Sequence, residues 1–533
     1  MAIEADIPDE DAPPLARKAG PRLSSDDAAA ANRANRWPIT ICIMGATTMV
    51  VLDQTIANVA LPHIQGGLSA SQDQITWVLT SYIVASALAL PMAGWLTARL
   101  GARRLLLISV ALFTISSALC GFAQNLPEIV IFRVIQGATG ASLMPLSQSL
   151  MYDIHPPEQR AQSMAVWGMG IMAAPMLGPV LGGWLTENWS WRWVFFINVP
   201  IGIASILGLL AFLSQPNNNE RRPFDGLGYG FIICFIGGLQ LVLDRGQSAG
   251  WLDSREIWTE IIICGLGLYL FTIHSLTAKH PFFHPAVMGN TRLLTTAFLG
   301  SVITAAMMSA TALQPIMVQR LLGYSVLQAG LIAAPRGVGM LIGMQMANIL
   351  VQRVDARILM VIGIISTAIS MLMMSQFSLQ MDAGPLIITG IIGGLGGPLV
   401  FMPVSLLALG ALGPESRTEG ATLFNLFRNL GSSLGIAIVA AMQVRDAQAA
   451  RDRLAEHITP DNPIIGAYMP QALQTAEGIA RLRGMAAQQA EMISYVSIFG
   501  LLGIICALCT PLIFFMKPSA PPTGPAQNTP MSE

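Results

Sequence analysis

The sequence predicts an all-α polytopic membrane protein, and three observations lead to that class. Hydrophobic residues make up 53% of the 533 residues and charged residues only 11%, against about 25% charged in soluble domains. The mean hydropathy is +0.58. Apolar runs of roughly 20 residues, long enough to cross a bilayer, recur along the chain. So few charged residues could not form the water-exposed surface of a soluble enzyme of this size. The net charge of −1 gives no excess of positive charge that would attract nucleic acid.

Fourteen such runs are predicted to be transmembrane helices, because lipid offers the backbone no hydrogen-bond partner. Barrel strands would be about ten residues long and alternating, and none of the runs has that pattern. The runs cover residues 39–60, 76–97, 105–123, 127–151, 163–185, 192–213, 226–243, 258–277, 293–319, 327–350, 357–377, 385–410, 418–442 and 493–516.

The segments outside these runs are polar. Residues 1–38 and 517–533 are expected to be disordered cytoplasmic ends. No short apolar core lies near Met1, so a signal peptide is not expected. Residues 443–492 form one long outer loop, within which Gln443–Glu456 is predicted to be helical.

The distribution of Lys and Arg predicts the topology, since short cytoplasmic loops carry the excess of both. An even number of spans puts both termini on one side. The short loops on that side carry Arg99, Arg103, Arg104, Arg160, Arg221, Arg222, Lys279, Arg292, Arg353, Arg357 and Arg417. The opposite short loops carry Arg192, Arg245, Arg255 and Arg320. Both termini are therefore predicted to be cytoplasmic.

A weak internal repeat predicts two six-helix bundles. The loop at 94–103 and the loop at 348–357 share a Leu-x-x-Arg pattern followed by Ala-Arg, with the two copies 254 residues apart. Parallel repeats of this kind build two-bundle transporters with the substrate site between the halves. The predicted bundles are 39–213 and 293–516, and two extra helices lie in the linker 214–292.

Asp53 is the candidate proton carrier, because it is the one acid well inside a predicted span. A charge at the bilayer centre costs about 2.5–3.5 kcal/mol on insertion scales, so such a residue usually faces a cavity or a partner. The alternative is a structural ion pair or a helix cap near the outer end of the first span.

Three arginines are also predicted to lie deep in spans: Arg133, Arg336 and Arg428. Arginine stays protonated, so each needs a carbonyl, a carboxylate or water. Arg133 lies in the same half as Asp53 and is a candidate partner in proton coupling. The alternative is a purely structural bond network. For Arg336 and Arg428 the neighbouring glycines suit tight helix packing as well as a cavity.

Several uncharged polar residues lie within predicted spans. Some are expected to line a substrate cavity, although each taken alone is equally explained by a hydrogen bond between helices. The candidate cavity residues, with the two arginines, are Asn58, Gln136, Gln314, Arg336, Asn425 and Arg428. No spacing of His, Cys and acids suggests a metal or a cofactor. The six cysteines lie in apolar runs and read as small core residues.

Six motifs in chain order resemble those of the major facilitator superfamily over about residues 39–516. They resemble in particular the fourteen-span drug:proton antiporters of the EmrB/QacA type. The motifs are LDQTIANVALP (52–62), GWLTARLGARR (94–104), RVIQG (133–137), APMLGPVLGG (174–183), FFINVPIG (195–202) and LDRG (243–246). The last two are similar to the EmrB branch.

The resemblance implies roles for these motifs. RVIQG is similar to the span-four motif linked to proton coupling, which implies that role for Arg133. Conformational roles are implied for Gly94, Arg99, Gly101, Arg103, Gly178, Pro179, Gly182 and Gly183. Three positions depart from the family pattern: Ala98 replaces an acid, Ala174 replaces a glycine, and Asp355 replaces a glycine in the second loop copy.

The resulting interpretation is a proton-driven inner-membrane exporter of lipophilic drugs, not an enzyme, that works by alternating access. The resemblance also implies a periplasmic adaptor (an EmrA-like membrane fusion protein) and an outer-membrane channel as partners. The alternatives are a dedicated exporter of a metabolite such as a siderophore or a fatty acid, a proton-linked importer, and a membrane enzyme or sensor. The span-five motif argues against the importer, and no soluble signalling domain or cluster of His, Cys and acids supports the last.

Overall fold

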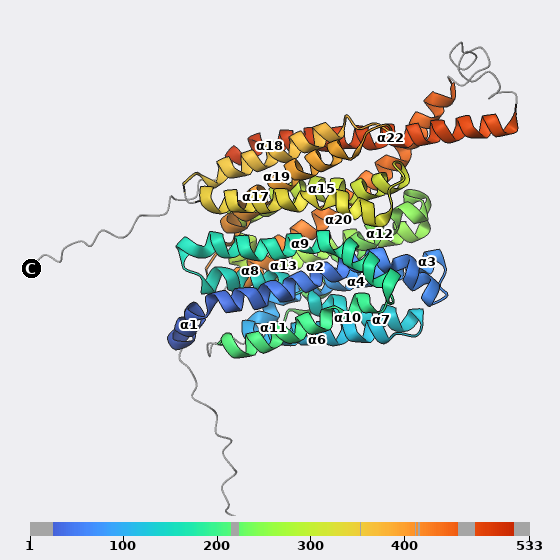
Figure 1. Ribbon diagram of the computed structural model, residues 1–533. Helices are drawn as coiled ribbons and strands as arrows, with labels where there is room; N and C mark the ends of the chain where they lie inside the picture. Colours follow the sequence, from blue (N-terminus) through green and yellow to red (C-terminus); the bar gives the residue numbers. More distant parts are fainter. Residues whose placement is uncertain are drawn as a thin grey trace, which may run out of the picture.

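A computed structural model describes residues 25–214, 223–351, 353–410, 412–413, 416–456 and 475–515. Long helices run side by side across the molecule, and both chain ends leave it on the same side (Figure 1). We call that side the terminal face and the other side the opposite face. The described residues contain helices and connecting turns only, so the predicted all-α class is confirmed.

The first half of the chain packs as one bundle, which we call the N-half. Its spans follow the predicted runs, and Pro91 precedes a 58° bend between the two helices of the second span. The helices are α2 (Arg36–Gly67), α3 (Gln72–Ile75), α4 (Trp77–Ala89), α5 (Met92–Leu100), α6 (Ala102–Phe122), α7 (Leu126–Gly140), α8 (Leu143–Ile154), α9 (Arg160–Asn188), α10 (Trp193–Phe196) and α11 (Asn198–Phe212).

The second bundle, the C-half, follows two extra helices. The extra pair is α12 (Gly226–Ala249) and α13 (Arg255–Thr277), and a short α14 (Pro285–Met288) leads into the C-half. The C-half consists of α15 (Thr291–Arg320), α16 (Val326–Ala333), α17 (Pro335–Leu350), α18 (Ala356–Met374), α19 (Ala383–Gly410), α20 (Arg417–Glu456) and α22 (Ala476–Cys509).

The predicted spans all fall on helices, and four of them are divided between two helices. Eleven helices of the described chain are long and apolar enough to cross a membrane, and two bent pairs bring the number to thirteen. The predicted span 327–350 forms α16 and α17, each shorter than the roughly 20 residues that a crossing needs. Pro335 begins α17, and a proline lacks the amide hydrogen that would continue the preceding helix.

Disorder was expected over residues 1–38, and this is wrong for the part that the structure describes. Residues Ser25–Ala34 form α1, and α2 begins at Arg36. The Asn32 side chain exchanges two hydrogen bonds with the backbone of Ser214, at 3.0 and 2.7 Å. These bonds fix α1 to the end of α11, and composition alone could not reveal them. Residues 1–24 and 516–533 lie outside the described residues.

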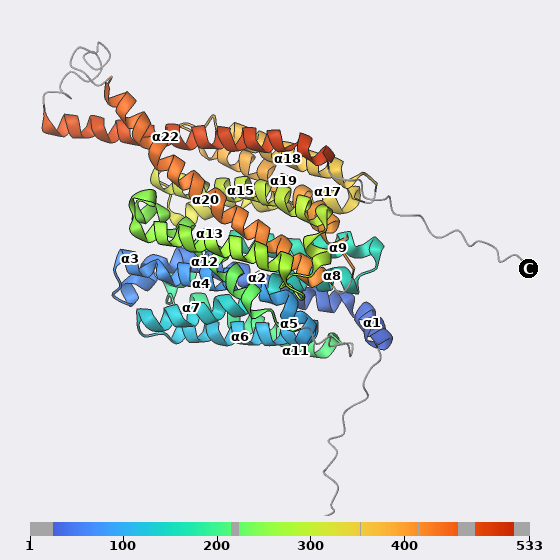
Figure 2. The same cartoon turned by 180° about the vertical axis from the view of Figure 1, so that it is seen from behind.

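The extra helices α12 and α13 lie along the junction between the two halves (Figure 2). Helix α12 packs against α4 of the N-half and against α20 of the C-half. The hydroxyl of Tyr229 donates to the carbonyl of Leu88 at 3.1 Å. The linker helices therefore cover one side of the seam between the bundles.

Helices α20 and α22 continue beyond the other spans as a pair at the opposite face (Figure 1). Helix α20 has 40 residues, about 60 Å at 1.5 Å per residue, which is twice the thickness of the hydrocarbon core. The predicted helix Gln443–Glu456 is confirmed as its final part. Ala450, Leu482 and Ala490 are buried in this extension. The middle of the predicted loop, residues 457–474, lies outside the described residues.

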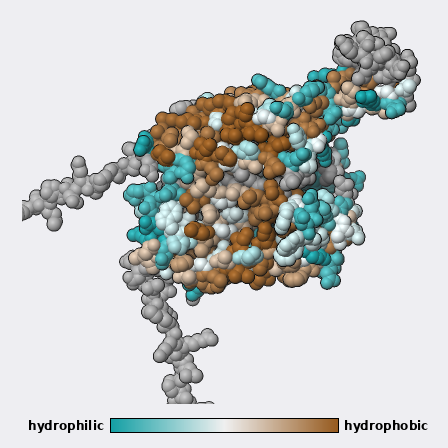
Figure 3. Space-filling model, viewed as in Figure 1, coloured by the Kyte–Doolittle hydropathy of each residue, from teal (hydrophilic) through white to brown (hydrophobic). Residues whose placement is uncertain are grey.

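The surface between the two faces is apolar. Figure 3 shows a hydrophobic belt between two hydrophilic ends. Large side chains such as Phe122, Leu207 and Leu276 are more than 60% exposed on helices of this belt. In water this exposure would be costly, whereas in lipid it is the expected outer surface.

Both halves contain the same close helix crossing, made by glycine. In the N-half, a Cβ on Gly137 of α7 would collide with the carbonyl oxygen of Tyr82 on α4. In the C-half, a Cβ on Gly394 of α19 would collide with the carbonyl oxygen of Arg336 on α17. Tyr82 and Arg336 are 254 residues apart, the same separation as the two loop copies. The repeat predicted from the loops therefore extends to the helix contacts.

The crossing makes the substitution Gly137→Ala informative. The added methyl group would meet backbone that cannot swing aside, so we expect a loss of about 1–3 kcal/mol in stability. The measurement is the thermal unfolding midpoint of the purified protein. Gly265→Ala is the matched control, because a Cβ at Gly265 on α13 meets nothing within 4 Å. Equal midpoints for the two variants would contradict the crossing.

Candidate functional site

The two charged residues predicted in the N-half form an ion pair at its centre. Arg133 Nη1 lies 2.6 Å from Asp53 Oδ2, and the side chains are 1% and 0% exposed. Asp53 comes from the middle of α2 and Arg133 from α7, 80 residues apart in the chain. The short distance and the exclusion of water make this a strong charge-assisted contact.

The other carboxylate oxygen of Asp53 is held by two amides. Oδ1 accepts from Gln136 Nε2 and from Asn198 Nδ2, both at 2.8 Å. Asn198 also donates to Ser117 Oγ at 3.0 Å, and Ser117 donates to the Phe195 carbonyl at 2.9 Å. The donors to Asp53 lie on α7 and α11, and Ser117 of α6 holds Asn198 in place, so three other helices fix one carboxylate.

Arg133 has further partners on α4 and α7. Its Nε donates to the Val78 carbonyl at 3.0 Å, and Nη1 also donates to Gln136 Oε1 at 2.9 Å. The guanidinium carbon lies 4.2 Å from the centre of the Tyr82 ring. The planar guanidinium of an arginine can make all of these contacts at the same time, whereas the ammonium group of a lysine cannot.

The geometry shows one of the two interpretations that the sequence left open for Asp53. The carboxylate is in an ion pair with Arg133, and both side chains are buried between helices of the N-half.

A second set of polar contacts joins the two halves near the terminal face. Arg417, at the start of α20, pairs with Asp153 at the end of α8. Thr418 donates to Ser149 Oγ at 2.9 Å. Further along α20 from Thr418, Asn425 Nδ2 donates to Gln148 Oε1 at 2.6 Å. We call these three contacts the terminal-face clasp.

Tyr152 reinforces the clasp from the N-half. The guanidinium carbon of Arg160 lies 4.0 Å from the centre of its ring, and that of Arg417 lies 4.6 Å from it. Arg160 Nε also donates to the Tyr152 carbonyl at 3.0 Å. One aromatic ring thus sits between an arginine of each half, which favours contact between α8 and α20.

The loop motif at 94–103 lies beside this clasp. A Cβ on Gly94 would lie 3.1 Å from Glu419 Cα, so α5 and α20 touch through the glycine. Gly101 has a positive φ of 81° between α5 and α6, a conformation that favours glycine. Arg103 donates to the Leu210 carbonyl at 3.1 Å, and Arg99 lies over the Trp95 ring at 5.2 Å. These four residues hold the turn and its contact with the C-half.

The glycines of the span-five motif pack α9 on α2, close to Asp53. A Cβ on Gly178 would collide with Thr55, and a Cβ on Gly182 would lie 3.3 Å from the Ile56 carbonyl oxygen. At Gly183 a Cβ would meet nothing within 4 Å. Helix α9 bends by 44° between Pro175 and Val180, the stretch that contains Pro179.

The six predicted cavity residues are divided among different places. Asn58 is exposed on α2, as is Gln54 one turn before it. Gln136 belongs to the Asp53 cluster, and Asn425 belongs to the clasp. Arg428 lies 5.2 Å from the centre of the Phe401 ring. Gln314 and Arg336 line a separate small cavity inside the C-half. The structure therefore does not bring the six into one site.

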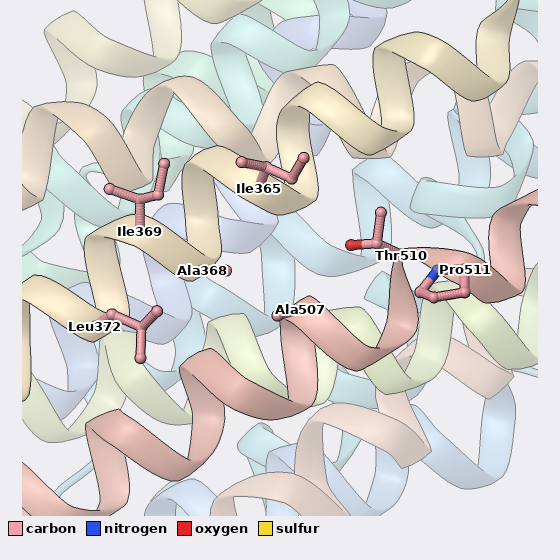
Figure 4. A pocket seen from close by; sticks show the side chains of 7 residues that line it. All are labelled: Ile365, Ala368, Ile369, Leu372, Ala507, Thr510 and Pro511. Carbon is pink, nitrogen blue, oxygen red and sulfur yellow. The ribbon is translucent and has the colours of Figure 1, made fainter.

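A larger, open hollow of about 490 Å³ lies on the surface between α18 and the end of α22. Its walls are apolar side chains of α18 and α22 with Thr510 and Pro511, and no charged group reaches it (Figure 4). It is remote from the Asp53 cluster in the N-half. Within the described chain, no group of three or more His, Cys, Asp or Glu is placed to hold a metal ion.

Sequence reasoning missed part of the site. Asn198, Ser117 and Gln148 are buried polar residues in apolar runs, and that pattern was the available signal. Asn198 was noted only within a family motif. Their partners lie 81 to 277 residues away, and helix periodicity does not reveal which faces meet.

Comparisons with known proteins agree with this architecture. The model of the Major Facilitator Superfamily matches residues 43–441. Multidrug export protein EmrB of Haemophilus influenzae is 34% identical over 491 residues, covering 90% of this chain and 95% of the relative. EmrB of Escherichia coli K12 is also 34% identical, with the same coverage. Fatty acid resistance protein FarB of Neisseria gonorrhoeae is 33% identical, covering 90% and 96%.

Solved structures share the fold at lower identity. The proton:xylose symporter XylE superposes with a TM-score of 0.58 at 15% identity, covering 91% of this chain and 97% of XylE. The human organic anion transporter MFSD10 gives 0.56 at 15% identity, covering 88% and 99%. With the two bundles, the extra helices and the relatives above, the chain belongs to the major facilitator superfamily, a family of multi-span membrane transporters rather than enzymes.

Proposed function

We propose that the protein exports lipophilic compounds across the bacterial inner membrane in exchange for protons, by alternating access. The observation that carries the proposal is the buried Asp53–Arg133 pair, a titratable carboxylate within the N-half. Relatives of the same length that are named multidrug export proteins support the choice of substrate. The loop and span-five glycines, which form close contacts between helices, supply the conformational motifs.

The terminal-face clasp supports a conformation closed on that face. The exposed polar side chains of Gln54 and Asn58, in the apolar middle of α2, suit a water-filled space reached from the other side. In this conformation Asp53 receives a proton from outside, which weakens its bond to Arg133. Release of the proton after the halves rock then restores the pair. One charge moved across the whole field is worth about 2.3 kcal/mol per 100 mV.

We assign the terminal face to the cytoplasm, because its short loops carry the excess of Lys and Arg. The paired extension of α20 and α22 then projects into the periplasm. Its length beyond the membrane suits contact with a periplasmic adaptor of the EmrA-like membrane fusion type, and through it with an outer-membrane channel.

A second candidate function is the export of a single class of organic acid. The 33% identical relative FarB is named for fatty acid resistance. Arg428 lies one turn from Asn425, which contacts the N-half, and no carboxylate among the described residues pairs with it. A binding site that contains an arginine without a paired carboxylate would suit neutral lipophiles and weak organic anions. Dications would bind there less well, because they need buried acids.

Asp53→Asn tests the proposed function directly. The amide cannot carry a proton, so we expect proton-driven transport in everted vesicles to fall at least tenfold at equal expression. A dye panel and a fluorescent fatty acid are measured in the same vesicles. Transport of the fatty acid alone would favour the second function. Glu187→Gln, at an exposed end of α9, is the control. Unchanged transport by Asp53→Asn would refute the proposal.

Arg133→Lys tests whether the guanidinium supports the acid. Lysine keeps the positive charge but cannot bond Val78, Asp53 and Gln136 together. We expect a several-fold loss in transport rate with substrate binding retained, measured by vesicle uptake and by equilibrium binding. Arg320→Lys, exposed at the end of α15, is the control. Normal transport by Arg133→Ala would leave the network a structural role only.

Cysteine labelling tests the assignment of the faces. A cysteine at Gly484, on the α22 extension where a Cβ meets nothing within 4 Å, should react with an impermeant maleimide added to intact spheroplasts. A cysteine at Glu158, exposed between α8 and α9, should react only after the membrane is opened. The unmodified protein, with its six native cysteines, gives the background. The reverse pattern would invert the topology.

A further inference from the structure

The C-half contains an arginine without a counter-charge beside a small closed space. Arg336 lies in the first turn of α17. Among the described residues it has no ion pair and no hydrogen bond, and its buried Nε has no acceptor. An unpaired charge in a membrane-spanning bundle is costly unless something neutralises it.

The space beside Arg336 is polar and has the size of one small group. Its volume is about 20 Å³, enough for one water-sized occupant. Gln314 of α15 lines it together with Thr367 and Ser370 of α18 and Thr389 of α19. No acid lines it.

The internal repeat explains why the space exists. Gly137 and Gly394 make equivalent crossings in the two halves. Four residues before the crossing glycine, the N-half has Arg133 and the C-half has Gly390. One residue before it, the N-half has Gln136 and the C-half has Gly393. Both glycines line the cavity. At Gly390 a Cβ would have no neighbour closer than 3.7 Å, so the room that the Arg133 side chain fills in the N-half is open in the C-half, whereas Ser370 approaches Gly393.

In the N-half, Arg133 and the crossing glycine are on the same helix, α7. In the C-half, Arg336 is on α17, the helix that faces the glycine on α19. Arg336 occupies the place of Tyr82, the ring on which Arg133 stacks. The N-half supplies its arginine with Asp53 at 2.6 Å, whereas the C-half supplies no carboxylate. We propose that the cavity beside Arg336 binds an exchangeable monovalent anion, either chloride or the carboxylate group of a small organic acid.

The donors at the cavity suit such a ligand. The hydroxyls of Ser370 and Thr367 already donate to the carbonyls of Thr389 and Gly363, at 2.7 and 2.9 Å. Thr389 likewise donates to the Pro385 carbonyl at 2.8 Å. The guanidinium of Arg336 and the amide of Gln314 are then the donors available to an anion.

The test measures thermal unfolding of the purified full chain in lipid nanodiscs at constant ionic strength. Sodium methanesulfonate is replaced stepwise by sodium chloride in one arm and by sodium acetate in the other. We expect a saturable rise in the unfolding midpoint in at least one arm. A rise with chloride alone identifies an inorganic anion site, and a rise with acetate alone identifies a carboxylate site.

Three variants make the result specific. Arg336→Gln should abolish the saturable rise. Gly390→Ala should raise the half-saturating concentration at least tenfold, because its methyl group enters the cavity while its nearest neighbour stays 3.7 Å away. This second variant carries the test if Arg336→Gln fails to fold. Arg428→Gln is the matched control, since it removes another deep arginine elsewhere on the C-half.

An identical rise in the parent and in Gly390→Ala would overturn the proposal. So would an unfolding midpoint that stays the same when methanesulfonate is replaced by chloride and when it is replaced by acetate. Loss of the rise in Arg428→Gln with retention in Arg336→Gln would place the anion elsewhere and overturn it too. The readout is binding rather than transport, so the outcome is independent of the proposed exchange of protons for lipophilic compounds.

Discussion

The N-half is organised around one buried ion pair, Asp53 with Arg133. A carboxylate inside a membrane must be neutralised and fully hydrogen-bonded, because neither lipid nor water is available to solvate it. Meeting that requirement brings in amides from α7 and α11, a hydroxyl from α6 and a carbonyl from α4. The relative positions of five helices therefore depend on one acid.

The two halves share backbone packing but differ in charge. Glycine brings the equivalent helices together in each, at Gly137 and at Gly394. The N-half fills the space beside that crossing with Arg133 and Gln136, whereas the C-half has glycines there and places Arg336 on the facing helix. A repeat that preserves helix geometry can thus hold a buried ion pair in one half and leave a different polar space in the other.

The contacts between the halves combine close packing with charge. Ala98 removes the acid that the loop motif usually carries, yet α5 still meets α20 where Gly94 touches Glu419. Asp153 and Arg417 supply the ion pair across the seam, and Tyr152 lies between two arginines. The contacts that join the halves at the terminal face therefore include charged and aromatic residues of α8 and α20.

The sequence by itself determined the class of protein, the approximate positions of the spans and the deep burial of Asp53 and Arg133, because hydropathy and a lone deep acid are local signals. Only the tertiary structure decided which polar residues meet. It brought Asn198 and Ser117 to Asp53, placed Asn425 in the clasp and left Arg336 with Gln314 beside a separate small cavity. The physical reason is that membrane helices are apolar on most faces, so their rotation and crossing depend on glycine contacts and distant partners that no local pattern encodes.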